Sequence, residues 1–322
     1  MKKKDIGHKT QHPHTSILTR QEIQAIHSDR KRVRSMSQPL SLTVITAIGP
    51  HANTEFFTDT ARSVSTAYTA AKEKMRSVSI SWVIAGGKDS NIHADIADIV
   101  RTECAHVFDN VHLLTPGGEV EDNSVGLMDV GNVYCAASIA RNMAASACNS
   151  DNTVLINCDA DDLMLPTRLI RAYEDFIYYS YPDFLIYPAF DIVEKDGTWH
   201  TEEKLSAYNC THVLKHGWFN DHVANSALDV HMASLCITKQ AFDKVGGYPG
   251  LPFVEDTVLA HTLSTRADMS GLASTVPTWI YRKHDNSLSH SGYNASAVLA
   301  RLISDFPAPQ GDKGKADNPQ VS

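Results

Sequence analysis

Three carboxylates stand within four residues of this chain, at Asp159, Asp161 and Asp162. They follow a short apolar run at 154–156, whose length and β-branched residues are typical of a buried strand. Acidic residues are depleted inside strands, so we expect the strand to end near Cys158 and the aspartates to lie at its carboxyl end. In open α/β sheets this is the edge where ligands bind.

Like charges this close repel one another unless water or a cation neutralises them. A hard divalent ion such as Mg²⁺ is usually held by one or two carboxylates together with the phosphates of a substrate. The acidic cluster therefore predicts a divalent-metal site that receives a phosphate-bearing ligand. The alternative is that Asp161 and Asp162 cap the next helix, because Asp is a common N-cap residue.

Strands and helices are expected to alternate regularly in the first half of the chain, where apolar residues are periodic. Buried strands are predicted at 41–48, 78–85, 111–115 and 153–158. Helices are predicted at 53–75, 92–105 and 134–147, with an acidic, Gly-rich loop at 116–131. This alternation implies βαβ units, so the predicted fold class is α/β with a Rossmann-like, doubly wound, mostly parallel sheet.

The second half departs from a purely parallel pattern and predicts a smaller mixed region. A helix is expected from Pro166 to about residue 179, because Pro is favoured at a helix start. Strands are expected at 183–194 and 198–200, on either side of the Asp196–Gly197 turn. Later elements are predicted as a strand at 229–238, helices at 240–245 and 255–266, and a strand at 278–284.

Length and composition limit the function classes. The chain has 322 residues, is 43% hydrophobic and 20% charged, and carries a formal net charge of −8, as in ordinary globular proteins. Residues 1–39 hold nine Lys or Arg against three Asp or Glu, so the remaining chain is more acidic than the whole. An acidic body argues against nucleic-acid binding, which needs a positive footprint.

The six cysteines form no C-x-x-C pair, which favours buried thiols and a reducing, cytoplasmic location. No apolar run reaches the ~18 residues of a membrane span, and no apolar segment of a signal peptide follows the basic N-terminus. Residues 1–39 are expected to form a loosely ordered tail. The alternative is that the basic cluster at 30–34 docks on an anionic surface at the inner membrane face, or on a partner.

In order and spacing, several segments together resemble a family-2 glycosyltransferase of the GT-A fold, over roughly residues 41–290. The matching segments are the opening strand at 41–48, Ala140-Arg141-Asn142, Asp159-Ala160-Asp161-Asp162 with Pro166, Phe242-x-x-Val245-Gly246-Gly247-Tyr248, Glu255-Asp256, and Tyr281-Arg282-x-His284 with Ser287. The resemblance implies transfer of a sugar from a nucleotide-diphosphate donor to an acceptor hydroxyl, usually with inversion. The acceptor would be a carbohydrate or another hydroxyl compound.

The resemblance also implies a division of the chain. Residues 40–305 would form the GT-A domain, with a nucleotide-binding half at 40–162 and an acceptor half at 163–305. The aromatic and histidine-rich segment at 202–222 is expected to form a mobile or acceptor-facing wall, although core packing explains this composition equally well. The aperiodic residues 306–322 are expected to form a disordered tail.

On the donor side, the resemblance makes Asp161 the direct ligand of Mn²⁺ or Mg²⁺. Asp159 would contact the ribose hydroxyls or share the ion, and His284 would be a further metal or phosphate contact. A divalent cation suits this chemistry because a diphosphate leaves readily only when its developing charge is stabilised. For His284 the alternative is an ordinary surface or core histidine.

On the acceptor side, the incoming hydroxyl must lose a proton to a base opposite the leaving group. The resemblance places this base in the acidic pair, with Asp256 favoured and Glu255 second. Two adjacent carboxylates raise one another's pKa, which suits a base. The alternative is that both merely stabilise a helix start, where acidic residues are favoured.

The nucleotide base is expected near the carboxyl ends of the first two strands, which nominates Thr46, Asp89 and Arg141. The turn Gly86-Gly87-Lys88-Asp89-Ser90 departs from the acidic pair that usually follows the second strand in this family, so the base identity stays open. For Arg141 the alternative is a structural ion pair. Gly246 and Gly247 are expected to end a helix rather than to hold phosphate.

Two other function classes stay open. A nucleotidyltransferase acting on a sugar phosphate would also use metal-bound aspartates, but it usually needs a Gly-rich, basic phosphate loop near the first strand. The turn Ile48-Gly49-Pro50-His51 supplies little of that. The other class is a non-catalytic domain that binds a sugar nucleotide.

Overall fold

The computed structural model describes most of the chain between residues 40 and 284. The described residues are 40–49, 52–86, 90–104, 110–115, 126–129, 137–148, 150–195, 198–202, 212–214, 218, 232–249 and 255–284. All of them belong to the unit Met36–Ser322. The two predicted tails, Asp89, Ser287 and most of the segment 202–222 lie outside the described residues.

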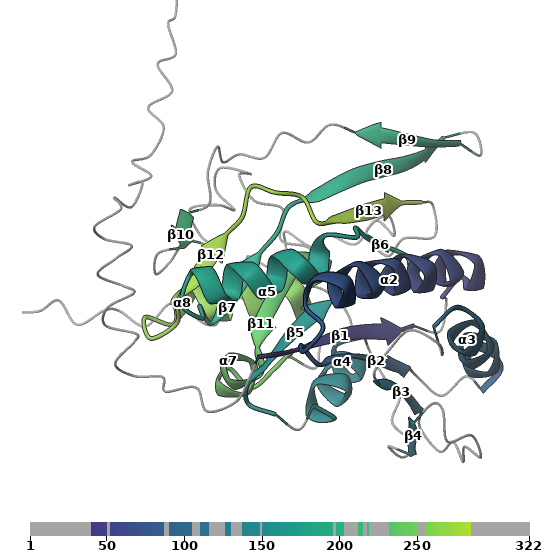
Figure 1. The fold of residues 1–322 in the computed structure, drawn as a ribbon, viewed down its shortest axis with the longest axis horizontal. Coiled ribbons are helices and arrows are strands. Elements are labelled where there is room, and N and C mark those ends of the chain that lie inside the picture. Colours follow the sequence, from purple (N-terminus) through teal and green to yellow (C-terminus); the bar gives the residue numbers. More distant parts are fainter. Residues whose placement is uncertain are drawn as a thin grey trace, which may run out of the picture. The chain divides into compact units, whose positions relative to one another are not determined.

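A nine-stranded sheet forms the centre of this unit (Figure 1). Its strands lie in the order β10-β12-β7-β11-β5-β1-β2-β3-β4. Their bounds are β1 Ser41–Ile48, β2 Ile80–Gly86, β3 Asn110–Thr115, β4 Gly126–Asp129, β5 Thr153–Asn157, β7 Phe184–Ile186, β10 His212–Leu214, β11 Leu235–Thr238 and β12 Gly271–Ala273. The strands β5-β1-β2-β3-β4 pair in parallel, whereas β11 runs antiparallel to both β5 and β7.

The prediction of a doubly wound, mostly parallel sheet is confirmed. From β1 the chain moves outward through β2, β3 and β4, and β5 then returns to the other side of β1. The strand order therefore reverses between β1 and β5. In open α/β sheets, such a switch point is the place where ligands bind.

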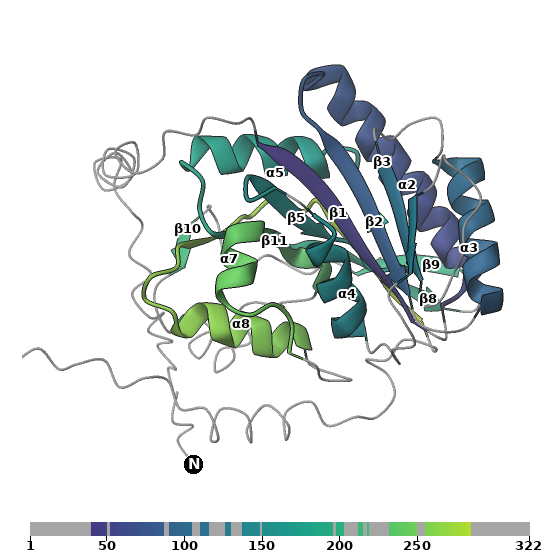
Figure 2. The ribbon, with the colours of Figure 1, turned by 90° about the horizontal axis from the view of Figure 1, so that it is seen from below.

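Helices cover both faces of the sheet (Figure 2). They are α2 Thr54–Lys74, α3 Ser90–Glu103 and α5 Arg168–Tyr178 on one face, and α4 Ala137–Ser146, α7 Lys239–Lys244 and α8 Glu255–Thr265 on the other. Side chains alternate along β1, with Val44 packed in the first of these layers and Ile45 in the second. Among the described helices, none is both long enough and apolar enough to cross a bilayer.

A smaller mixed sheet has the order β6-β13-β8-β9, built from β6 Leu163–Met164, β8 Ala189–Lys195, β9 Thr198–Glu202 and β13 Trp279–Lys283. The prediction of one strand over 183–194 is wrong, because β7 pairs in the large sheet and β8 in the small one. Pro188 lies between them and has no N–H for a ladder, so the chain changes sheets there. The strand predicted at 229–238 is also shorter, since a 3-10 turn, Met232–Ser234, precedes β11.

Two short strands fall in segments predicted as irregular. β4 lies within the loop predicted at 116–131, and β6 lies between the acidic cluster and α5. The alternative in which Asp161 and Asp162 cap α5 is wrong, because this helix begins at Arg168 after Thr167. The acidic cluster is therefore separated from the helix by a strand, and its carboxylates serve other partners.

Candidate active site

The acidic cluster lies where the strand order reverses. β5 ends at Asn157, and the Cys158 N–H donates to the Ile45 carbonyl of β1 over 3.0 Å. The turn then passes the start of α2, where the Thr60 hydroxyl lies 3.0 Å from the Ala160 carbonyl oxygen and 2.7 Å from that of Asp162. The three aspartates therefore follow the carboxyl end of β5, as predicted.

Arg141 joins the two acidic groups that were singled out from the sequence. Its Nη2 lies 2.6 Å from Asp159 Oδ1, and its Nη1 lies 2.8 Å from Glu255 Oε1. The arginine comes from α4, and Glu255 is the first residue of α8. All three side chains are largely buried, with 8% of Arg141, 24% of Asp159 and 13% of Glu255 exposed. One guanidinium therefore brings the acidic cluster and the acidic pair to the same edge of the sheet.

Burial and charge act against each other at these carboxylates. Burial raises the pKa of Asp159 above its ordinary value, Arg141 opposes this rise, and the charges of Asp161 and Asp256 add to it. Burial likewise raises the pKa of Glu255, again opposed by Arg141 and reinforced by Asp256. The charge of Asp256 therefore acts on both carboxylates.

Asp256 also interacts with the start of its own helix. Its Oδ1 accepts hydrogen bonds from the Thr257 N–H over 2.6 Å and from the Thr257 hydroxyl over 3.1 Å. Glu255, in contrast, directs its carboxylate to Arg141. The helix-stabilising interpretation of the acidic pair therefore agrees with the contacts of Asp256 better than with those of Glu255.

Asp161 and His284 form a second pair at this edge. Asp161 Oδ2 lies 3.1 Å from His284 Nε2, and 38% of the Asp161 side chain is exposed against 7% of the histidine. The imidazole packs on the Phe56 ring, with centroids 4.7 Å apart. The buried Nδ1 of His284 has no hydrogen-bond partner among the described residues, and the metal contact of this histidine stays a prediction.

The donor set of this pair fits a divalent cation that is shared with a ligand. Among the described residues, no group of three or more His, Cys, Asp or Glu is arranged to hold a metal ion. Asp161 and His284 would supply one oxygen and one nitrogen, and substrate phosphates and water would supply the other ligands. This division is usual for Mg²⁺-type sites, which often use few protein ligands.

Asp162 differs from its two neighbours because it is buried. Only 1% of the residue is exposed; its Oδ1 accepts from the Arg282 N–H over 3.1 Å, and its Oδ2 has no partner in the described part of the chain. Burial raises the pKa of Asp162 well above the ordinary value, and the charges of Asp161 and Asp159 add to the rise. The folded protein therefore favours a protonated Asp162.

Stability should consequently fall as pH rises above about 4, the pKa of an unfolded Asp, until the pH passes the folded pKa of Asp162. Over that window the folded state holds a proton that the unfolded state releases. Asp162→Asn has no such proton to release. The free energy of unfolding of the variant, relative to that of wild type, should therefore rise by up to about 1.4 kcal/mol per pH unit. Urea unfolding of both proteins from pH 4.5 to 7, without added metal, measures the difference. Parallel pH profiles would contradict a raised pKa.

Comparison with known proteins supports the fold. No family model and no curated protein sequence matches the chain. Among solved structures, residues 1–349 of S. aureus TarS, a glycosyltransferase, superpose with a TM-score of 0.50 at 12% identity. The match covers 76% of this chain and 60% of that structure. The chain has a glycosyltransferase-like fold.

The three residues predicted near the nucleotide base have different outcomes. Thr46 is fully buried, and its hydroxyl accepts a hydrogen bond from Trp82 Nε1 over 3.0 Å, so the side chain already has a structural partner. Asp89 lies outside the described residues. Arg141 matches its structural alternative, the ion pair, and its contact with a nucleotide stays a prediction.

The Asn142 amide holds the backbone of Tyr248, which follows α7, a role that was not predicted from the sequence. Its Nδ2 donates to the Tyr248 carbonyl over 2.7 Å, and its Oδ1 accepts from the Tyr248 N–H over 2.8 Å. The Arg141 guanidinium lies over the Tyr248 ring, with its Cζ 5.9 Å from the ring centroid. The only signal in the sequence was the joint presence of the Ala140-Arg141-Asn142 and Gly246-Gly247-Tyr248 segments.

Gly247→Ala should destabilise the fold by about 2–4 kcal/mol, since it combines backbone strain with a clash. Gly247 has φ +74°, and a Cβ there would lie 2.6 Å from Asn142 Oδ1, which is held by the Tyr248 contact. Gly246→Ala is the matched control: its φ is +83°, but a Cβ would meet nothing within 4 Å. That variant should lose only about 1–2 kcal/mol. Equal losses of unfolding free energy in the two variants would show that the Asn142 side chain can move away from the new Cβ without cost.

Proposed function

We propose that this protein is a metal-dependent, inverting glycosyltransferase that moves a sugar from a nucleotide-diphosphate donor to an acceptor hydroxyl. The observation that carries the proposal is the double ion pair of Arg141. It joins Asp159, on the donor side, to Glu255, which adjoins the proposed base. A direct displacement needs both groups of carboxylates at one site, because the acceptor attacks the carbon that the diphosphate leaves.

On the donor side, Asp161 and His284 would hold Mn²⁺ or Mg²⁺, and Asp159 would face the ribose hydroxyls. The bound cation would supply Lewis-acid stabilisation of the leaving diphosphate. His284 suits this role because it is buried beside Asp161, which keeps the two ligating atoms together. Arg141 supports the same side by holding Asp159 in place.

On the acceptor side, Asp256 would accept the proton of the attacking hydroxyl. The carboxylate of Glu255 is held by Arg141, so we assign the acceptor proton to the neighbouring Asp256. A base that faces the acceptor, opposite the leaving group, gives a single displacement and therefore inversion. Docking of the basic cluster at 30–34 on an anionic membrane surface or a partner stays the alternative to a loosely ordered tail.

A panel of nucleotide sugars, each with and without Mn²⁺, tests the proposal. A donor that binds the folded state should raise Tm only with metal present. Incubation with that donor and an acceptor alcohol should release a nucleoside diphosphate. Release of pyrophosphate from a sugar phosphate and a nucleoside triphosphate would indicate nucleotidyl transfer instead. Metal-dependent binding without either product would leave a sugar-nucleotide-binding domain.

A further inference from the structure

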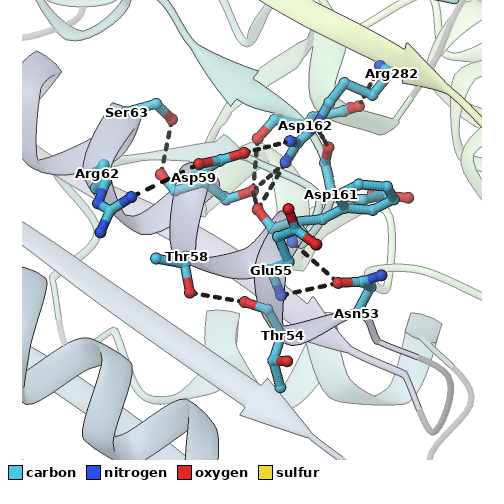
Figure 3. A network of polar contacts seen from close by, with 12 residues as sticks. Asn53, Thr54, Glu55, Thr58, Asp59, Arg62, Ser63, Asp161, Asp162 and Arg282 are labelled. Carbon is cyan, nitrogen blue, oxygen red and sulfur yellow. Dashed lines mark hydrogen bonds and ion pairs between the residues drawn. The ribbon is translucent and has the colours of Figure 1, made fainter. Parts of the chain in front are cut away.

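Arg282 is a buried arginine that contacts two elements beside the acidic cluster. It lies on β13, and only 2% of its side chain is exposed. Nε donates to the backbone carbonyl of Asp161, while Nη1 lies 3.1 Å from Asp59 Oδ2 and Nη2 lies 2.7 Å from the Phe56 carbonyl oxygen (Figure 3). The guanidinium therefore bridges the Asp161 turn to the first turns of α2.

The start of α2, which carries two of these contacts, is capped by Asn53. Asn53 caps the helix, with its Oδ1 accepting from the N–H groups of Glu55 and Phe56 over 2.8 and 3.2 Å (Figure 3). Farther along the same helix, Ser63 Oγ accepts from the Met164 N–H over 3.0 Å. The acidic turn is thus attached to α2 just beyond the aspartates, and Arg282 supplies an attachment at Asp161 itself.

Arg282 is linked to both members of the proposed cation pair. It is hydrogen-bonded to the backbone of Asp161, and it precedes His284 by two residues along the chain. The Phe56 ring contacts both neighbours, with the Arg282 guanidinium 4.8 Å from its centroid and the His284 ring 4.7 Å away. Arg282 therefore adjoins both residues of the pair, whose Oδ2 and Nε2 atoms lie 3.1 Å apart.

The charge of Arg282 cannot be its contribution to cation binding. A buried positive charge beside a divalent cation repels it, so charge alone would weaken the site. What Arg282 supplies is a planar fork of donors, which reaches several oxygens at once in fixed directions. A lysine keeps the charge but presents a single nitrogen on a flexible stem, so it loses that geometry.

We propose that Arg282 is a positioning residue, which sets the spacing of Asp161 and His284 and thereby the affinity of the pair for a divalent cation. This inference rests on the metal assignment in the proposed function. Residues that orient metal ligands from behind typically change metal affinity by about 10–100-fold when they are replaced. Arg282→Lys in the full chain should therefore raise the Mn²⁺ dissociation constant by about tenfold or more.

Mn²⁺ titration followed by electron paramagnetic resonance, with inorganic pyrophosphate present in place of the donor diphosphate, measures this constant. Arg266→Lys is the matched control, because Arg266 follows α8, is 37% exposed and pairs with Asp268 rather than with Asp59 or Asp161. It should bind Mn²⁺ like wild type. Arg282→Met should also bind more weakly than wild type, whereas tighter binding would show that charge dominates and would overturn the proposal.

The outcomes separate this inference from the proposed function. If wild type binds Mn²⁺ and Arg282→Lys binds it equally well, the positioning role of Arg282 is wrong, whereas the assignment of Asp161 and His284 as metal ligands is not affected. If wild type binds no Mn²⁺, the metal assignment falls and this inference falls with it. Should Arg282→Lys fail to fold, Asp59→Asn tests the positioning role instead. Asp59 is 48% exposed, so its replacement is tolerated, and the substitution removes one charged partner of the Arg282 guanidinium. Wild-type affinity in Asp59→Asn would then overturn the role.

A second measurement distinguishes positioning from general stability. Hydrogen exchange of backbone amides in the metal-free protein should increase at residues 159–164 in Arg282→Lys and stay unchanged in the β1–β3 strands. Uniformly faster exchange would indicate a merely structural role. High Mn²⁺ concentrations should also restore donor turnover in Arg282→Lys, because a misplaced ligand pair lowers affinity without removing the catalytic groups.

Discussion

Asp256→Asn is expected to lower kcat by about 10²–10⁴-fold, the usual contribution of a positioned general base, while donor affinity stays within about twofold of wild type. Asn keeps the size of the side chain but cannot accept the proton of the acceptor hydroxyl. Its side-chain oxygen can still accept from the Thr257 N–H, as Asp256 does, so the start of α8 should persist. Steady-state release of nucleoside diphosphate, together with donor titration, measures both quantities.

Glu255→Gln is the informative control for this variant. It breaks the charged pair with Arg141 but leaves Asp256 ionisable, so it should reduce kcat less than Asp256→Asn. It should also weaken the packing of the edge, because a buried guanidinium loses one of its two carboxylates. If Glu255→Gln loses turnover and Asp256→Asn keeps it, the two roles are reversed.

Asp161→Asn should remove metal-dependent donor binding, with the donor dissociation constant in the presence of Mn²⁺ rising by about 100-fold or more. The variant loses the more exposed carboxylate of the cation pair, and the neutral amide is a poor ligand beside His284. Thermal shift with the identified donor shows the loss, since the Mn²⁺-dependent rise in Tm should disappear.

Asp162→Asn is the matched control for Asp161→Asn, because it lies one residue away and differs in burial. In the wild type, Asp162 is 1% exposed and its side chain accepts a hydrogen bond from the Arg282 N–H. The Asp162→Asn variant should therefore keep the Mn²⁺-dependent rise in Tm. A metal-dependent shift that survives in Asp161→Asn would contradict the ligand assignment. Loss of the shift in both variants would show that the turn, rather than one carboxylate, governs binding.

Local signals explain why much of the fold was predictable. β1 was expected at the residues where it forms, and α2 within one residue of its bounds, because apolar periodicity and capping are properties of neighbouring residues. The break after β7 has a local signal in Pro188, which the prediction of one strand over 183–194 passed over. What the sequence did not show is that β7 pairs with β11 in the large sheet, whereas β8 pairs with β13 in the small one.

The candidate site divides in the same way. The order of residues was enough to predict that three aspartates follow a buried strand and that an acidic pair begins a later helix. It did not determine that Asp162 is buried while Asp161 is partly open, that Arg141 pairs with residues 18 and 114 positions away, or that Arg282 reaches back to α2. Those contacts were decided by the packing of α2, α4 and α8 around the sheet, because ion pairs and burial depend on elements that meet only in the folded chain.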